Sequence, residues 1–292
     1  MKRIAAIVTM ILALSSCAIH PAKNDRLYRA GRAVEPGEYI PQGKVVEMSH
    51  PCSVPGPTTR GITVYLPKDY ELNQEHYPVL YLLHGARGNQ HSWIRKGDVF
   101  RLTDSLVNNG SCPPFILVLP NTNQYKNDRD CDSSRIKGAI ESMFEIEGTV
   151  ESAFVNDVVN FIDAKFRTIA EKRGRAIAGL SIGALQSIYI SANNPSTFDY
   201  IGLFSPFYKI IPFTSDYDAF YKNLEYRQMV QFAVPPKLYM ICIGKKDFFY
   251  PHIACYRHYL DREGYRYEYF ENNGAHEWVD WKKFYCHFLT EV

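Results

Sequence analysis

Gly179-Leu180-Ser181-Ile182-Gly183 decides the fold, because this stretch places one serine between two glycines. A short apolar run, residues 175–178, precedes it, and residues 184–189 follow with mostly apolar side chains. This order predicts a strand, a sharp turn and a helix, with the hydroxyl of Ser181 exposed at the turn. Strand and helix pass too close there for a Cβ atom, so the flanking positions must be glycine. The segment therefore predicts a nucleophilic serine at the carboxyl end of a strand.

Strand and helix patterns alternate from about residue 43 onward. Near-continuous apolar runs, typical of strands covered on both faces, occupy residues 61–67, 78–83, 115–120, 201–204 and 238–243. Apolar residues recur at the helical period over residues 154–166 and 253–260. The 292 residues are 46% hydrophobic, enough for one large domain with a single core. The sequence predicts an α/β fold with a mostly parallel central sheet and helices on both faces.

Two segments do not follow this alternation. Residues 121–150 are polar, and residues 205–236 are rich in Tyr and Phe and contain four prolines. Both come directly after predicted strands, at the edge of the sheet where the loops of such folds carry function. We expect them to form walls or lids of a substrate cleft.

The N-terminus is typical of an exported protein. Lys2 and Arg3 precede an apolar stretch of secretory length, and the small residues Ser15 and Ser16 precede Cys17. This pattern resembles a bacterial lipobox, in which Cys17 becomes the lipidated first residue. We interpret residues 1–17 as a lipoprotein signal peptide and residues 18–40 as a polar tether. Ala18 after the cysteine favours an outer membrane, where the cell has one.

Charge and cysteine content exclude some classes of function. Loss of Lys2 and Arg3 with the leader lowers the formal charge from +2 to zero, which gives no general case for nucleic-acid binding. Besides Cys17 the chain has six cysteines, which permit disulfides without indicating how they pair. Their spacing does not indicate a zinc site, and neither a metal nor a cofactor is expected.

A serine hydroxyl needs a histidine to take its proton and a carboxylate to orient that histidine. Asp247 follows the predicted strand 238–243 after a short loop, and His276 follows an alternating run at residues 265–271. The order serine, acid, histidine and the position of each at a strand end predict a catalytic triad of Ser181, Asp247 and His276. Asp199 precedes a strand, at the wrong edge, and Asp280 is too close to His276 in sequence.

An oxyanion hole needs two backbone N–H groups. One is expected from Ile182, directly after the nucleophile. The other is expected from Ala86, in the loop after the strand at residues 78–83. His84 in the same loop comes before the nucleophile and the acid, so we expect it to be structural.

With these residues placed, the chain resembles the feruloyl and acetylxylan esterases of the α/β-hydrolase superfamily, with S-formylglutathione hydrolases as cousins. The matching stretches are residues 64–67, 77–85, 175–183, 243–247 and 274–278. The resemblance implies an α/β-hydrolase catalytic domain over residues 41–292. Ala184 departs from the second glycine of many relatives, and the two lid-like segments match no pattern that fixes the substrate.

The resemblance implies a serine carboxylesterase that hydrolyses feruloyl or acetyl esters on plant polysaccharides such as xylan. Its partners would be an acylated polysaccharide and a membrane, through the N-terminal lipid. Alternatives are a short-chain ester or thioester hydrolase, a sugar acyltransferase, and a carbohydrate-binding lipoprotein without activity. Substrate-binding candidates are Trp93, Tyr208, Phe213 and Trp278.

Overall fold

The computed structural model describes residues 39–54, 56–86, 88–122, 151–209 and 215–292. The predicted leader, Cys17, nearly all of the tether and Phe213 lie outside the described residues, as does most of the polar segment 121–150. Within the described residues, no helix is long and apolar enough to cross a membrane.

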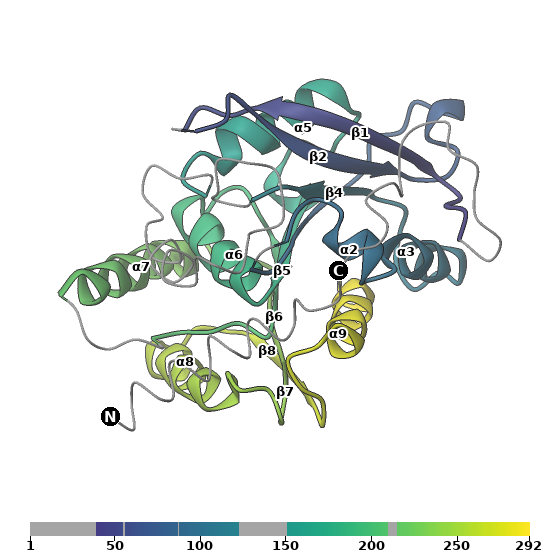
Figure 1. The fold of residues 1–292 in the computed structure, drawn as a ribbon. Coiled ribbons are helices and arrows are strands. Elements are labelled where there is room, and N and C mark those ends of the chain that lie inside the picture. Colours follow the sequence, from purple (N-terminus) through teal and green to yellow (C-terminus); the bar gives the residue numbers. More distant parts are fainter. Residues whose placement is uncertain (1–38, 55, 87, 123–150, 210–214) are drawn as a thin grey trace.

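The fold is built on one eight-stranded sheet with the order β1-β2-β4-β3-β5-β6-β7-β8 (Figure 1). The first two strands pair antiparallel with each other, β2 pairs antiparallel with β4, and the remaining pairs are parallel. This confirms the predicted mostly parallel sheet. The strands are β1 (Lys44–Pro51), β2 (Thr59–Leu66), β3 (Val79–Leu83), β4 (Ile116–Pro120), β5 (Arg175–Leu180), β6 (Tyr200–Phe204), β7 (Leu238–Gly244) and β8 (Glu268–Asn272).

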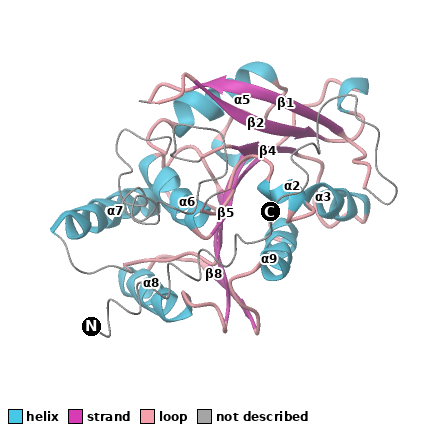
Figure 2. Ribbon diagram, in the orientation of Figure 1, coloured by secondary structure: helices cyan, strands magenta, loops and turns pink. Residues whose placement is uncertain are grey.

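Helices cover both faces of the sheet, as predicted (Figure 2). Side chains of α5, α6, α7 and α8 pack on one face, and those of α2, α3 and α9 pack on the other. The π-helical turn η3 (Val155–Val159) leads into α5. The helices are α2 (Ser92–Arg95), α3 (Val99–Asn108), α5 (Asn160–Lys165), α6 (Ile182–Asn193), α7 (Ser215–Ala233), α8 (Tyr250–Glu263) and α9 (Trp278–Thr290).

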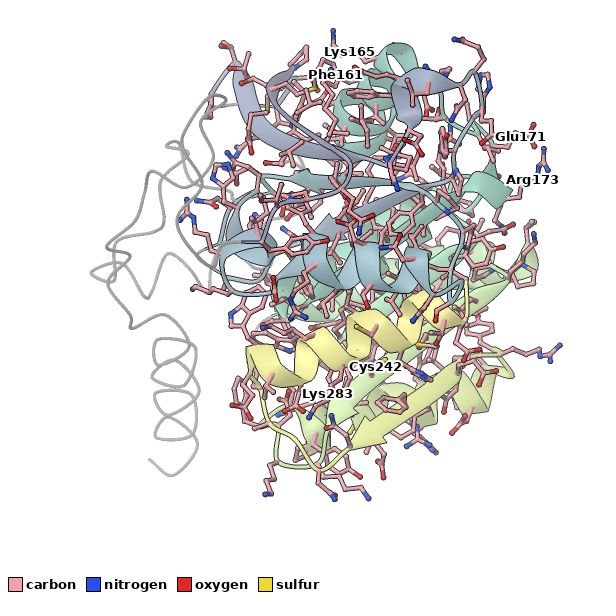
Figure 3. The ribbon with its side chains drawn as sticks, turned by 90° about the vertical axis from the view of Figure 1, so that its right-hand side faces the viewer. Phe161, Lys165, Glu171, Arg173, Cys242 and Lys283 are labelled. Carbon is pink, nitrogen blue, oxygen red and sulfur yellow. The ribbon has the colours of Figure 1, made fainter. Side chains whose placement is uncertain are left out.

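The strands alternate their side chains between the two faces, which explains why their sequences are apolar throughout. In β7, Ile241 faces the α6 and α8 side, whereas Cys242 faces α9. Cys242 is completely buried, behind α9 in the view of Figure 3, and burial raises the pKa of its thiol. It fits the role of a small core hydrophobe.

The described part of the segment 205–236 is largely the helix α7, and its role as a wall or lid of the substrate cleft stays a prediction. α7 turns Tyr221, Leu224, Gln228 and Gln231 toward the interior, at the spacing of one helical face. The amide of Gln228 donates to the buried hydroxyls of Tyr239 and Tyr256, at 3.2 and 2.5 Å. Two of the four buried positions, Gln228 and Gln231, are therefore polar. For this reason the apolar residues of the segment alone do not show a helical period.

Candidate active site

The turn that carries Ser181 is strained and has no room for side chains beside it. Ser181 joins β5 to α6 with φ 55° and ψ −117°, a backbone conformation that costs free energy in any residue except glycine. A Cβ atom on Gly179 would lie 2.4 Å from the carbonyl oxygen of Gly183. A Cβ atom on Gly183 would lie 2.4 Å from the carbonyl oxygen of His84. The two glycines predicted from the sequence are thus required by close backbone contacts.

Two interlocked loops position Asp247 beside His276. The backbone N–H of Lys246 donates to the carbonyl of Gly274 at 2.8 Å, which joins the loop after β7 to the loop after β8. Oδ1 of Asp247 accepts the N–H of Phe249 at 2.8 Å, so Oδ2 is left to face the imidazole. The acid side chain is fully buried, and the histidine side chain is 5% exposed.

The structure brings the three predicted residues into one hydrogen-bonded chain. Nδ1 of His276 lies 2.9 Å from Oδ2 of Asp247, and Nε2 lies 3.0 Å from Oγ of Ser181. A carboxylate only accepts, so Nδ1–H donates to Asp247, and Nε2 of the neutral ring accepts the hydroxyl proton of Ser181. This is the arrangement that a histidine needs in order to act as a general base toward a serine.

Aromatic rings surround the imidazole on several sides. The ring centroids of Phe248, Trp281 and Phe249 lie 4.4, 4.9 and 5.1 Å from that of His276. Rings this close exclude water, and electrostatic interactions are stronger where water is excluded. The sequence reading did not assign these residues a role, although Phe248 and Phe249 directly follow Asp247.

The two rival carboxylates lie where they cannot replace Asp247. Asp199 sits at the amino end of β6 and forms ion pairs with Lys172 and Lys237, at 3.7 and 3.8 Å. Asp280 is buried below the histidine loop, where it accepts the N–H of Ala275 at 2.9 Å. Asp280 therefore supports the backbone of the loop that carries the imidazole.

A charged pair lies at the rim of the acid loop. The ammonium of Lys245 is 3.0 Å from a carboxylate oxygen of Glu271, and the hydroxyls of Tyr250 and Tyr269 donate to the other oxygen. The hydrogen bond from Lys245 is the main cause that lowers the pKa of Glu271, and the same bond raises the pKa of Lys245. Solvent reaches both side chains, so this pair contributes little to stability.

A second residue with positive φ lies next to the nucleophile. Ser205 has φ 49°, and its N–H donates to the carbonyl of Cys242 at 2.7 Å. Its hydroxyl accepts the indole N–H of Trp281 at 3.0 Å. The preceding residue, Phe204, accepts the N–H of Ser181 at 2.8 Å. The sequence reading missed Ser205, and the signal available for it was its place between β6 and Pro206.

The predicted oxyanion residues lie in the two segments that meet at the nucleophile. Ile182 is the first residue of α6, and Ala86 follows Gly85 in the loop after β3. A Cβ atom on Gly85 would lie 3.6 Å from Cβ of Ser181, so this loop runs against the nucleophile. The role of Ala86 and Ile182 as oxyanion donors stays a prediction.

The predicted substrate-binding aromatics are mostly core residues. Trp93 is 1% exposed and its indole N–H donates to the carbonyl of Leu83, and Tyr208 is also 1% exposed and bonded to Glu225. These positions correct the expectation that Trp93 and Tyr208 contact substrate, because packed neighbours enclose both rings. Trp278 is half-buried and packs edge-on against Trp93, with ring centroids 5.2 Å apart.

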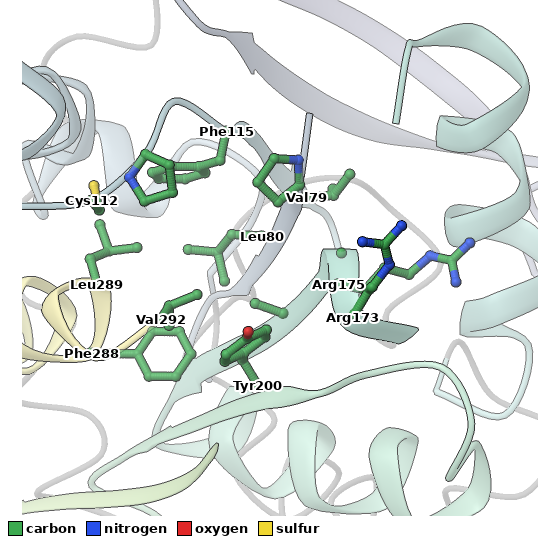
Figure 4. A pocket seen from close by; sticks show the side chains of 14 residues that line it. Val79, Leu80, Cys112, Phe115, Arg173, Arg175, Tyr200, Phe288, Leu289 and Val292 are labelled. Atoms are coloured by element: carbon green, nitrogen blue, oxygen red, sulfur yellow. The ribbon is translucent and has the colours of Figure 1, made fainter. Parts of the chain in front are cut away.

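Other features of the described residues are distant from this chemistry. No group of three His, Cys, Asp or Glu lies close enough to hold a metal, and the cysteines described, Cys52, Cys112, Cys242, Cys255 and Cys286, are unpaired. An apolar pocket lies at the amino ends of β3, β5 and β6, where Val79, Arg175 and Tyr200 contribute to its lining (Figure 4). That edge of the sheet is opposite to Ser181.

The sequence and the fold match known esterases. The sequence model of a family described as putative esterases matches residues 56–247. An endo-1,4-β-xylanase/feruloyl esterase of Xylanibacter ruminicola is 36% identical over 148 residues, which cover 49% of this chain and 19% of that protein. This chain thus aligns with about a fifth of its curated relative.

Solved structures share the fold over nearly their whole length. A ferulic acid esterase superposes with a TM-score of 0.70 and 24% identity, covering 86% of this chain and 98% of the other. An S-formylglutathione hydrolase from Staphylococcus aureus has a TM-score of 0.65 and 16% identity, covering 87% and 99%. At these identities the likeness establishes the α/β-hydrolase fold.

Proposed function

The chain belongs to the putative esterase family, and from this premise we propose that it is a serine carboxylesterase acting on acylated plant polysaccharide. The observation that carries the proposal is the hydrogen-bonded chain from Ser181 through His276 to Asp247, at 3.0 and 2.9 Å. A serine on a strained turn at the carboxyl end of β5, whose Oγ lies within hydrogen-bonding distance of Nε2 of a histidine, suits acyl transfer from an ester.

The reaction begins with attack of Oγ of Ser181 on the ester carbonyl. Nε2 of His276 takes the hydroxyl proton, and the Asp247 carboxylate stabilises the imidazolium that forms. The N–H groups of Ile182 and Ala86 stabilise the charge on the carbonyl oxygen. His276 then donates the proton to the departing sugar alkoxide, which leaves an acyl group on Ser181. Water, deprotonated by His276, hydrolyses this acyl-enzyme and restores the serine.

Feruloyl or acetyl groups on a polysaccharide such as xylan are the proposed substrates. The relative from Xylanibacter ruminicola, whose name combines xylanase and feruloyl esterase, supports this choice at 36% identity. The likeness to an S-formylglutathione hydrolase keeps short acyl thioesters as the second candidate. The two differ in leaving group, a sugar hydroxyl or a thiol.

The proposed location is the surface of a membrane, through a lipid on Cys17. The lipobox-like sequence around Cys17 supports this part of the proposal. An enzyme held at the cell surface or in the periplasm would meet polysaccharide fragments there. The predicted tether, residues 18–40, would separate the catalytic domain from the lipid.

A substrate panel tests the proposed function. The purified protein should hydrolyse p-nitrophenyl acetate, and among natural-type substrates it should have a higher kcat/KM for methyl ferulate or acetylated xylan than for an S-acyl glutathione. The Ser181→Ala variant is the control and should be inactive on all of them. Faster turnover of the thioester would reject the polysaccharide substrate, and failure on every ester would reject the enzyme class.

A further inference from the structure

His84 is a buried histidine whose protonation can be deduced from its neighbours. The side chain is 3% exposed, and Nε2 lies 3.1 Å from the backbone N of Thr122, which can only donate. Nε2 therefore carries no proton. The proton of the neutral ring sits on Nδ1, which lies 2.8 Å from the carbonyl oxygen of Gly85 and donates to it. One ring thus joins the end of β4 to the loop after β3.

The carbonyl of Gly85 is held by two donors. Besides Nδ1 of His84, the N–H of Gly88 donates to it at 3.1 Å. A Cβ atom on Gly88 would lie 2.8 Å from Nδ1 of His84, so the turn packs directly on the ring. Because two donors approach the same oxygen, the orientation of this peptide group is fixed.

A fixed carbonyl fixes the N–H on the other side of the same bond. The peptide group is planar and trans, so the N–H of Ala86 points opposite to the carbonyl of Gly85. The carbonyl faces the ring of His84, and the loop runs against Ser181 at Gly85. The N–H of Ala86 is one of the two donors that the proposed reaction needs.

A series of buried hydrogen bonds supports His84 on the Nε2 side of its ring. The hydroxyl of Thr122 donates to Oε1 of Gln186 at 2.9 Å, and Nε2 of Gln186 donates to Glu151 at 2.6 Å. Glu151, Thr122 and Gln186 are 1%, 1% and 4% exposed. Gln186 lies on α6, a little more than one turn beyond Ser181. These hydrogen bonds therefore join the loop of His84 to the helix that begins directly after the nucleophile.

We propose that His84 is a positioning residue for the oxyanion hole: its Nδ1–H holds the Gly85–Ala86 peptide so that the N–H of Ala86 faces the oxygen of the tetrahedral intermediate. His84 does not touch the substrate in this role. The inference rests on the proposed esterase function, because an oxyanion hole has a use only where an acyl group is transferred.

Two variants of His84 test its two hydrogen bonds separately, the bond to Gly85 and the bond from Thr122. In His84→Asn the amide N takes the place of Nδ1 and can still donate to Gly85. In His84→Gln the amide oxygen takes the place of Nε2 and can still accept from Thr122, but the donor to Gly85 is lost. We expect kcat on p-nitrophenyl acetate to fall about 100-fold in His84→Gln, since one misplaced oxyanion donor costs about 10²–10³ in kcat. In His84→Asn the fall in kcat should be about tenfold or smaller.

Other measurements distinguish positioning from a general loss of structure. KM should stay unchanged in both variants, and the affinity for phenylboronic acid, which forms a tetrahedral adduct on the serine, should fall by the same factor as kcat. Equal losses in the two variants, or wild-type kcat in His84→Gln, would overturn the proposal. A wild-type enzyme without any ester hydrolysis would instead refute the proposed function.

NMR on the wild-type protein decides the matter if a variant does not fold. The ¹⁵N shifts of the imidazole should show a protonated Nδ1 and a bare Nε2 in His84. The amide proton of Ala86 should move downfield when phenylboronic acid binds. A proton on Nε2, or an Ala86 resonance that does not respond to the adduct, would contradict the proposal.

Discussion

Nδ1 of His276 lies 2.9 Å from Oδ2 of Asp247, and this bond fixes both the tautomer and the direction of the imidazole. The acid is held in turn by the N–H of Phe249, so its orientation does not depend on the histidine alone. Asp280 lies four residues beyond His276 and is buried as well, yet its carboxylate accepts from the backbone of Ala275 and the side chain of Asn272 and pairs with Lys283. The two carboxylates therefore have separable roles.

Asp247→Asn should lower kcat by about 10⁴-fold with little change in KM or stability, because an amide can donate to Nδ1 and so favours the wrong tautomer. Asp280→Asn should keep kcat within tenfold of wild type but lower the free energy of unfolding by about 1–3 kcal/mol, because a buried acceptor for Ala275 is weakened. Kinetics and urea unfolding on both variants check this. Equal losses of kcat would contradict the assignment of the acid.

Gln228 on α7 should be important for stability even though it is polar. Gln228→Ala leaves a cavity and removes the donor to the hydroxyls of Tyr239 and Tyr256, so we expect a loss of about 2–3 kcal/mol in the free energy of unfolding. Met229 is the next residue of the helix and is 52% exposed, so Met229→Ala should change stability by no more than about 0.5 kcal/mol. Urea denaturation measures both. A similar loss in the two variants would be inconsistent with the buried face of α7.

Much of the fold could be predicted because buried parallel strands need apolar side chains on both faces. The runs that form β3, β4 and β7 are apolar for this reason. The glycines on either side of Ser181 predict the turn between strand and helix. α7 was missed because Gln228 and Gln231 occupy core positions that an apolar period would fill. β1 was not assigned because its residues are mostly half-buried or exposed, as expected for an edge strand.

The site was predictable to the extent that it depends on chain order and strand ends. Ser181, Asp247 and His276 each follow a strand of the parallel part of the sheet, and such strands end at one edge. Aromatic character alone did not reveal what a ring contacts. Trp93 looked like a ligand-binding residue in the sequence, but its indole is bonded to the backbone of β3 in the core.

His50 should make the protein sensitive to mild acid. Its side chain is buried in β1, Nε2 has no partner, and desolvation lowers its pKa below 6.5, with Arg60 adding to this effect and Asp157 opposing it. Because the unfolded chain binds the proton more readily, stability is lost as the pH falls from about 6.5 toward the folded-state pKa, and the loss stops below that value. This contribution is absent at higher pH.

His50→Asn keeps a donor for the carbonyl of Pro51, which Nδ1 contacts at 2.7 Å, and has no proton to bind. We expect its loss of unfolding free energy between pH 7.5 and pH 5 to be smaller than that of the wild type, measured by urea denaturation at both pH values. His76→Asn, at an exposed position, is the matched control and should behave as the wild type. An unchanged pH dependence in His50→Asn would refute the role of His50.

Cys17 should decide where the protein resides in the cell. Cys17→Ser removes the thiol that a lipid would modify, so most of the protein should move from the membrane fraction to the soluble fraction. Cys255→Ser, at an exposed position of α8, should leave the distribution unchanged. Immunoblots of fractionated cells measure this. Membrane partitioning of Cys17→Ser equal to that of wild type would exclude lipid anchoring at this residue.

The most direct test of the central claim is a kinetic cycle on the serine and the histidine, whose Oγ and Nε2 lie 3.0 Å apart. kcat on p-nitrophenyl acetate is measured for Ser181→Ala, His276→Ala and the double variant, with circular dichroism to confirm folding. Groups that act as one unit are not additive, so each single change should lower kcat by about 10⁴-fold or more, and the double variant should be no worse than either. Near wild-type turnover in folded Ser181→Ala, or losses that multiply in the double variant, would contradict the account.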